Sequence, residues 1–209
     1  MYKFMRSFTE FFNGFFTDKF TELDLYEMGK QTPCMLMTCA EEHSIITKVH
    51  SKDRYKMVHV VTITEDDNLL SPFRKAKWKR CIRSSLDCVF FAGPCTGGSP
   101  WNRLNKRLSA TTALMIRAKE MIYWELWGGF AGGLQRVINM DAMAIMELPR
   151  GCAYCKDPRN TDMINGTDAH VHDFDGCMYG LKTNHINEGT AIKKPWRIVT
   201  WGVNSGICI

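Results

Sequence analysis

The sequence lacks any apolar run of the roughly 20 residues that a membrane-spanning helix needs. It also lacks the pattern of a secretory signal, because the aromatic stretch "MYKFMRSFTEFFNGFF" is interrupted by Arg6 and Glu10 and has no small-residue cleavage site. Its nine cysteines are odd in number and irregularly spaced, unlike those of a disulfide-stapled secreted domain. We therefore expect an intracellular protein with reduced thiols.

Internal repeats and low-complexity segments are also missing, so the composition is that of an ordinary folded domain. Apolar residues make up 45% of the 209 residues, and charged residues make up 23%. This balance excludes global disorder and allows a full core. The net charge of +5 permits a polyanionic partner without requiring one. We expect one domain over 21–209, preceded by an arm over 1–20.

The arm carries phenylalanines at helical spacing, namely Phe4, Phe8, Phe11, Phe12, Phe15 and Phe16. This spacing predicts an amphipathic helix over 1–20. Packing of its aromatic face on the parent domain is the plainest interpretation. A membrane-surface arm or a protein-binding arm stays open as an alternative.

Downstream of the arm, strand and helix patterns alternate. Strands are expected at 23–29, 56–67, 87–93, 141–149, 169–176 and 193–201. Helices are expected at 33–50, 71–84, 103–139 and 152–165, with the third divided in two by glycines at 128–133. This order predicts an α/β fold with a Rossmann-like, mainly parallel sheet that has helices on both faces. Ligands of such sheets bind beyond the carboxyl ends of the strands.

Two of the expected strand ends are chemically unusual. The segment "DCVFFAGPCTGGSPW" (87–101) passes from an apolar strand into a Gly-Pro-Cys turn, and "AIMELP" (144–149) ends a strand on a glutamate. In their order these segments resemble the core of the cytosine-C5 nucleic-acid methyltransferases, a class I S-adenosylmethionine-dependent family. The resemblance covers roughly residues 21–203. It implies S-adenosyl-L-methionine as cofactor and DNA or RNA as substrate. The motifs match the family's only in degenerate form, which suggests a fast-evolving source such as a virus or mobile element.

The resemblance implies a catalytic role for three residues. Cys95 takes the place of the nucleophile, whose thiolate adds to C6 of the pyrimidine and makes C5 reactive. Glu147 takes the place of the carboxyl that holds the base through N3. A thiol titrates near about 8.5, so it needs activation. We expect this from backbone N–H groups of the Gly-Gly-Ser turn, from a helix starting near Asn102, and from the Ser99 hydroxyl.

The resemblance also implies a cofactor site along the strand ends. "LDLYEMG" (23–29) would support the methionine part of the cofactor, and the acids that follow "VVTI" would bind the ribose hydroxyls. The cofactor contacts are then Tyr26, Met28, Gly29, Glu65, Asp66, Gly93 and Pro94. The N-terminal helix is a candidate cover for this cofactor pocket.

Basic residues near the strand ends are candidate contacts to nucleic-acid phosphates. They are Arg103, Lys106, Arg107, Lys194 and Arg197. A solvated helix face explains the first three equally well.

A different constellation of cysteines and histidines lies at 152–177 and ends at Cys177. Cys152 and Cys155 are separated by two residues, and His170 and His172 alternate in an expected strand. Cysteine and histidine are the usual ligands of tetrahedral zinc. The plainer interpretation is two buried thiols and two ordinary strand histidines.

Two other functions stay open beside the cytosine-C5 methyltransferase. Only Gly29 stands where a glycine-rich turn is expected, which suits a catalytically inactive, methyltransferase-like structural or nucleic-acid-binding subunit of a larger assembly. The third possibility is a methyltransferase that acts on another atom, with Cys95 only lining the site.

Overall fold

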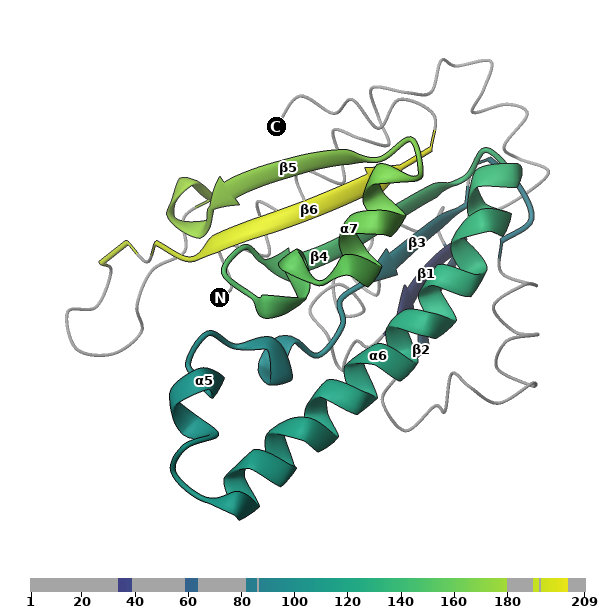
Figure 1. Cartoon of the computed structure of the whole chain (residues 1–209). Coiled ribbons are helices and arrows are strands. Elements are labelled where there is room, and N and C mark those ends of the chain that lie inside the picture. The colour runs from purple at the N-terminus through teal and green to yellow at the C-terminus, as the bar shows by residue number, and fades with distance from the viewer. Residues whose placement is uncertain are drawn as a thin grey trace.

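The computed structural model describes residues 34–38, 59–63, 82–85, 87–179, 190–191 and 193–202, which form a mixed α/β fold (Figure 1). The helix expected at 1–20 and the strand expected at 23–29 lie outside the described residues. Of the helix expected at 71–84, only 82–84 are described, and these three residues are not helical.

One six-stranded sheet has the order β2-β1-β3-β4-β6-β5. The strands are β1 Cys34–Thr38, β2 His59–Ile63, β3 Cys88–Phe91, β4 Met143–Pro149, β5 His170–Asp175 and β6 Pro195–Trp201. The pairs β1–β2, β1–β3 and β3–β4 are parallel, whereas β6 is antiparallel to both β4 and β5. Five strands therefore run in one direction and β6 in the other. Each of the last five matches a strand expected from the sequence.

The first strand, β1, corrects the prediction of a helix over 33–50. Cys34–Thr38 is a strand between β2 and β3, with Met35 paired to Val60 and Leu36 to Val89. A short continuous apolar run fits a buried strand and a helix equally well. Pairing on both sides gives this segment the hydrogen bonds of a central strand.

The helical segments are η1 Cys95–Gly98, α5 Asn102–Asn105, α6 Ala110–Asn139, η2 Ala153–Lys156, α7 Pro158–Asn165 and η3 Gly176–Tyr179. The prediction of a helix break at 128–133 is wrong, because α6 continues through those glycines. The break lies instead before α6, where the Ser109 hydroxyl accepts a hydrogen bond from the Thr112 amide at 3.0 Å. Within the described ranges, no helix is long and apolar enough to cross a membrane.

The core lies between α6 and one face of the sheet. α6 buries a stripe at helical spacing, made of Ile116, Tyr123, Leu126, Phe130, Leu134 and Val137. This stripe packs against alternating sheet residues such as Phe91, Met146 and Trp201. In the described part of the chain α6 and α7 cover the same face (Figure 1), so helices on both faces are not observed there. Residues of the other face, including Phe90 and Ile145, are also buried, as expected of central strands.

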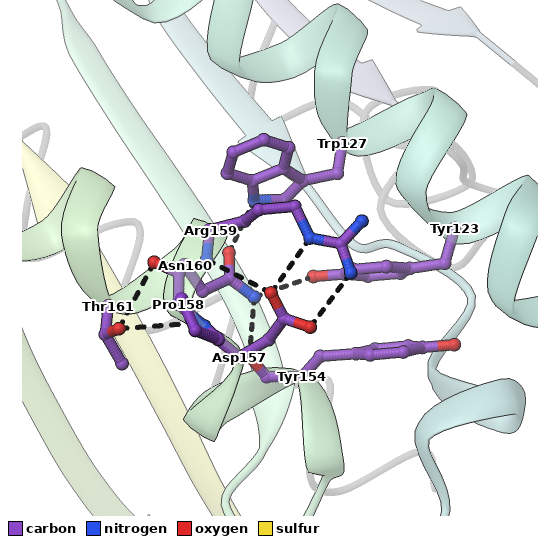
Figure 2. Close-up of polar contacts among 8 residues, drawn as sticks. All are labelled: Tyr123, Trp127, Tyr154, Asp157, Pro158, Arg159, Asn160 and Thr161. Atoms are coloured by element: carbon purple, nitrogen blue, oxygen red, sulfur yellow. Dashed lines mark hydrogen bonds and ion pairs between the residues drawn. The ribbon is translucent and has the colours of Figure 1, made fainter.

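A buried asparagine joins α7 and η2 to α6 (Figure 2). Asn160 Nδ2 donates to the Tyr154 carbonyl at 2.8 Å and to the Tyr123 hydroxyl at 3.3 Å. Its Oδ1 accepts from Trp127 Nε1 at 2.5 Å. The rings of Tyr123 and Tyr154 stack with centroids 3.7 Å apart. Asn160 is fully buried, and its amide pairs polar groups from α6 with the backbone of η2.

Replacing Asn160 with alanine should lower the free energy of unfolding by about 2–4 kcal/mol, because it removes the hydrogen-bond partner of the Trp127 indole N–H and of the Tyr123 hydroxyl. The matched control is Asn165→Ala at the exposed end of α7, which should change stability by less than about 0.5 kcal/mol. Urea unfolding of both variants measures the difference. Equal effects in the two variants would show that this hydrogen-bonded junction contributes little.

Candidate active site

Three charged or reactive side chains come from one edge of the sheet. β3 ends at Phe91, and Cys95 follows it after three residues. Glu147 lies near the carboxyl end of the adjacent parallel strand β4. Because β6 runs the other way, its first residue, Pro195, and the preceding Lys194 lie at this same edge, where Pro195 pairs with Asp175 at the end of β5. The topology therefore brings Cys95, Glu147 and Lys194 from neighbouring positions in the sheet.

The Cys95 turn packs tightly against η2. Gly97 and Gly98 are buried. A Cβ at Gly97 would overlap the hydroxyl of Tyr154 in η2, and a Cβ at Gly98 would overlap the thiol of Cys152, which directly precedes η2. The sequence-based hypothesis gave these glycines the role of exposing backbone N–H groups. The structure gives them a packing role, which fixes the start of η1 and with it Cys95.

Asn102 holds the same turn from its other side. Its side-chain amide donates to the Thr96 carbonyl at 2.9 Å and to the Gly97 carbonyl at 2.5 Å. The helix expected near Asn102 is the four-residue α5. Asn102 is its first residue, and its side chain fixes the Cys95 turn through these two hydrogen bonds. Ser99 caps η1 through its backbone, with its N–H donating to the Thr96 carbonyl at 3.3 Å. Among the described contacts, its hydroxyl makes no hydrogen bond to the Cys95 thiol.

Electrostatics link Cys95, Glu147 and Lys194 into one cluster. Burial raises the pKa of Glu147 to about 7, and the positive charge of Lys194 acts in the opposite direction. Burial also raises the pKa of the Cys95 thiol, and the negative charge of Glu147 raises it further. Lys194 and the Cys95 backbone N–H favour the thiolate. Lys194 is itself placed by Trp196, with its Nζ 4.0 Å from the centre of the indole ring.

This cluster can exchange a proton near neutral pH. A carboxyl with a pKa of about 7 is a competent acid and a competent base under physiological conditions. Since the Glu147 charge opposes ionisation of Cys95, protonating Glu147 makes the thiolate easier to form. The two groups therefore favour opposite charge states.

The implied cofactor contacts are only partly described. Tyr26, Met28, Gly29, Glu65 and Asp66 lie outside the described residues. Gly93 and Pro94 are described, between β3 and η1. A Cβ at Gly93 would lie 2.7 Å from the Phe91 ring and 2.8 Å from the Tyr123 ring, so packing alone requires a glycine there. Pro94 caps the start of η1.

The basic residues do not form one surface. Arg103, Lys106 and Arg107 are exposed on and after α5, where Lys106 Nζ is 2.7 Å from Glu120 Oε1. Arg197 is on the sheet face that carries α7, and its guanidinium makes two 2.8 Å hydrogen bonds with the Asp173 carboxylate. Of the five candidates, only Lys194 joins the Cys95–Glu147 cluster.

The alternative zinc constellation does not come together. Cys155 packs in the core on the side of α7 and donates to the Pro149 carbonyl at 3.4 Å. Cys152 donates to the Cys95 carbonyl at 3.9 Å. His172 is paired with Ile198 on the opposite face of the sheet. Within the described ranges, no three His, Cys, Asp or Glu side chains are grouped as a metal site requires.

Sequence reasoning missed the roles of three residues. It assigned Lys194 to phosphate binding. Lys194 directly precedes β6, which is antiparallel to its neighbours, so this lysine lies at the same edge of the sheet as the carboxyl ends of β3 and β4. The clamp by Asn102 and the contact of Cys152 with the Cys95 turn left no signal in the sequence, because both depend on how loops meet in space.

No family model, curated protein or solved structure matches the chain at a significant level. The assignment of function therefore depends on the geometry and electrostatics of this edge.

The raised pKa of Glu147 has a consequence for stability. Its folded value of about 7 exceeds the ordinary value of 4.5, so the native state holds the proton more tightly. Stability from this group is therefore full at low pH and is lost as the pH rises from about 4.5 to about 7. The full difference between low and high pH corresponds to on the order of 3–4 kcal/mol.

Glu147→Gln should remove this dependence, because the amide keeps the shape without the titration. Relative to wild type, the variant should gain about 2–3 kcal/mol between pH 5 and pH 8. Urea unfolding at the two pH values measures the gain. Glu125→Gln, at an exposed position of α6, is the matched control and should follow wild type. A constant difference between Glu147→Gln and wild type at both pH values would contradict a raised pKa.

Proposed function

We propose that this protein is an S-adenosylmethionine-dependent nucleic-acid methyltransferase of the cytosine-C5 type, with Cys95 as nucleophile and Glu147 as the proton-handling partner. One observation carries the proposal. Cys95 and Glu147, fifty-two positions apart in sequence, come from the carboxyl ends of adjacent parallel strands, and the Glu147 charge raises the pKa of the Cys95 thiol.

The order of the strands supports a Rossmann-like classification. From β1 the chain moves outward to β2 on one side and then to β3 on the other, which creates a switch point between β1 and β3. In open α/β sheets, ligands bind outside the strand ends at such a point. The Cys95 turn follows β3 and so begins beside that position. A mainly parallel sheet is also what the methyltransferase resemblance implies.

S-adenosylmethionine would bind at this switch point. The cofactor would supply an electrophilic methyl group there. Glu65 and Asp66, which follow β2 in the sequence, are the residues proposed to bind its ribose hydroxyls. Pro94 and Gly93 would lie against it through the backbone between β3 and η1.

The chain's own side chains can carry the chemistry at the base. The Cys95 thiolate would add to C6 of a cytosine, forming a carbon–sulfur bond while N3 gains a proton from the Glu147 carboxyl. A Glu147 pKa of about 7 leaves it partly protonated at neutral pH, as this step requires. The charge of Lys194 would stabilise whichever of the two groups is ionised. A stacked base hides C6, so the substrate base must be flipped out or single-stranded.

One observation favours the inactive, nucleic-acid-binding alternative. Burial and the nearby Glu147 charge both raise the pKa of the Cys95 thiol, which keeps it protonated at rest. A catalytic site must overcome this when substrate binds, whereas an inactive subunit has no need to. Cofactor binding and covalent trapping separate the two functions.

Calorimetric titration with S-adenosylmethionine should give saturable binding, with a Kd of roughly 1–100 μM, in the usual range for enzyme substrates. S-adenosylhomocysteine should compete for the same site. Absence of heat with both nucleosides would remove the enzyme proposal and leave the inactive subunit.

Covalent trapping tests the role of Cys95. A single-stranded oligonucleotide with 5-fluorocytosine, incubated with S-adenosylmethionine, should form an adduct that survives denaturation. After methyl transfer to C5 there is no C5 proton to remove and the fluorine cannot leave as a cation, so the thiol cannot be eliminated. Cys95→Ser should abolish the adduct and lower turnover at least about a thousandfold. Cys177→Ser on η3 is the control and should trap normally. If cofactor binds and Cys95→Ser still turns over, the enzyme methylates another atom.

A further inference from the structure

The outer face of α6, turned away from the sheet, carries an exposed apolar stripe. Leu114, Met115, Met121 and Ile122 are between 48% and 65% exposed. With Ala118 they recur at the three- and four-residue spacing of one helix face. The buried stripe of α6 lies on the opposite side of the helix. In Figure 1 this N-terminal half of α6 extends past the end of the sheet.

Two bases border the stripe, one on each side. Arg117 stands one turn before Met121 on one border, and Lys119 stands one turn after Met115 on the other. Both side chains are exposed, and neither has an ion-pair partner among the described residues. A helix laid along this stripe would place its own flanking positions opposite these two charges.

The same face continues into glycines. Gly128 and Gly132 are exposed and four residues apart, and a Cβ at either position would meet nothing within 4 Å. Each glycine costs a helix interior about 1 kcal/mol relative to alanine. Packing within the described chain therefore does not require them. Glycines at this spacing allow the backbone of another helix to approach closely.

From these features we infer that the outer face of α6 is the docking surface for an amphipathic helix of a partner protein. The docked helix has an apolar stripe flanked on both sides by acidic residues. The partner's apolar stripe packs on the exposed apolar residues of α6, which are Leu114, Met115, Met121 and Ile122. Its acidic residues pair with Arg117 and Lys119. Its backbone approaches α6 closely at Gly128 and Gly132. The inference holds whether or not the protein is a methyltransferase.

Two other occupants fit this surface less well. A second copy of the chain, paired through the same face, would bring Arg117 and Lys119 against one another, and like charges at these positions oppose pairing. An anionic lipid surface would suit the two bases. However, Glu125 is exposed on the same face between the apolar half and the glycines, and a carboxylate there disfavours insertion into an anionic bilayer.

Designed peptides test the charge and apolar requirements together. The probe is a 21-residue helix of three heptads, with leucine at positions a and d and glutamate at e and g. The matched control carries lysine at e and g. Fluorescence anisotropy should give a Kd for the glutamate peptide of roughly 10–100 μM and at least tenfold weaker binding of the lysine peptide.

Variants of the protein give the decisive comparison. Arg117→Glu with Lys119→Glu should reverse the preference, so that the lysine peptide binds at least tenfold more tightly than the glutamate peptide. Arg103→Glu with Arg107→Glu changes the net charge equally but lies off the stripe, and should keep the original preference. Met121→Asp, in the stripe, should weaken the glutamate peptide at least tenfold. Circular dichroism should show the native helix content in every variant.

Other results would overturn the inference. Equal binding of the two peptides would mean non-specific apolar adhesion, and no binding of either would remove the docking surface. Co-sedimentation with phosphatidylserine vesicles that is lost in the Arg117→Glu, Lys119→Glu variant, without peptide binding, would assign the face to lipid. A concentration-dependent dimer in analytical ultracentrifugation that Met121→Asp abolishes would assign it to a second copy.

Discussion

The ring of Tyr154 holds together the parts of the structure on which the candidate site depends. It stacks on Tyr123 of α6, and its hydroxyl reaches the space that a side chain at Gly97 would need. Asn160 fixes it from behind by binding both the Tyr154 carbonyl and the Tyr123 hydroxyl. The long helix, the short η2 segment and the turn that starts at Cys95 are thus packed through one aromatic side chain. The position of the thiol follows from this packing, together with the contact of Cys95 with the edge of the core.

The ionisation of the side chains at the candidate site follows from how few charged groups lie at this edge of the sheet. Glu147 is removed from water on a central strand, so its carboxyl holds a proton more tightly than an exposed one. Cys95 is partly buried, and the negative charge of Glu147 makes its thiolate less favourable. Lys194 enters only because β6 runs against its neighbours, and it offsets both effects. The carboxyl of Glu147 therefore changes its charge near neutral pH, whereas the Cys95 thiol holds its proton there.

The sequence predicted the elements that are determined by neighbouring residues along the chain. It did not predict features that depend on contacts between residues far apart in the sequence. Strands β3, β4 and β6 are apolar runs bounded by glycine, proline or polar residues, and they were located correctly. The Gly-Pro-Cys turn and Glu147 were also singled out, since their residue types are unusual at strand ends.

β1 was mistaken for a helix because only pairing with β2 and β3 distinguishes a strand from a helix in this segment. The glycines of α6 suggested a break because local propensity counts their cost, whereas burial of Tyr123, Phe130 and their neighbours keeps the helix continuous. The packing role of Gly97 and Gly98 depends on Cys152 and Tyr154, more than fifty residues away.

The reversed strand also constrains the order in which the molecule can be completed on the ribosome. In the sheet order, β5 neighbours only β6, yet β6 is the last of the described strands to be synthesised. Until Pro195–Trp201 have emerged, β5 has no strand to pair with, while β3, α6 and β4 can already associate. Lys194 emerges just ahead of that strand, so a nascent chain carries the thiol and the carboxyl for some time before their counter-charge arrives. Among the described elements, the edge that carries the candidate site is thus one of the last to be completed.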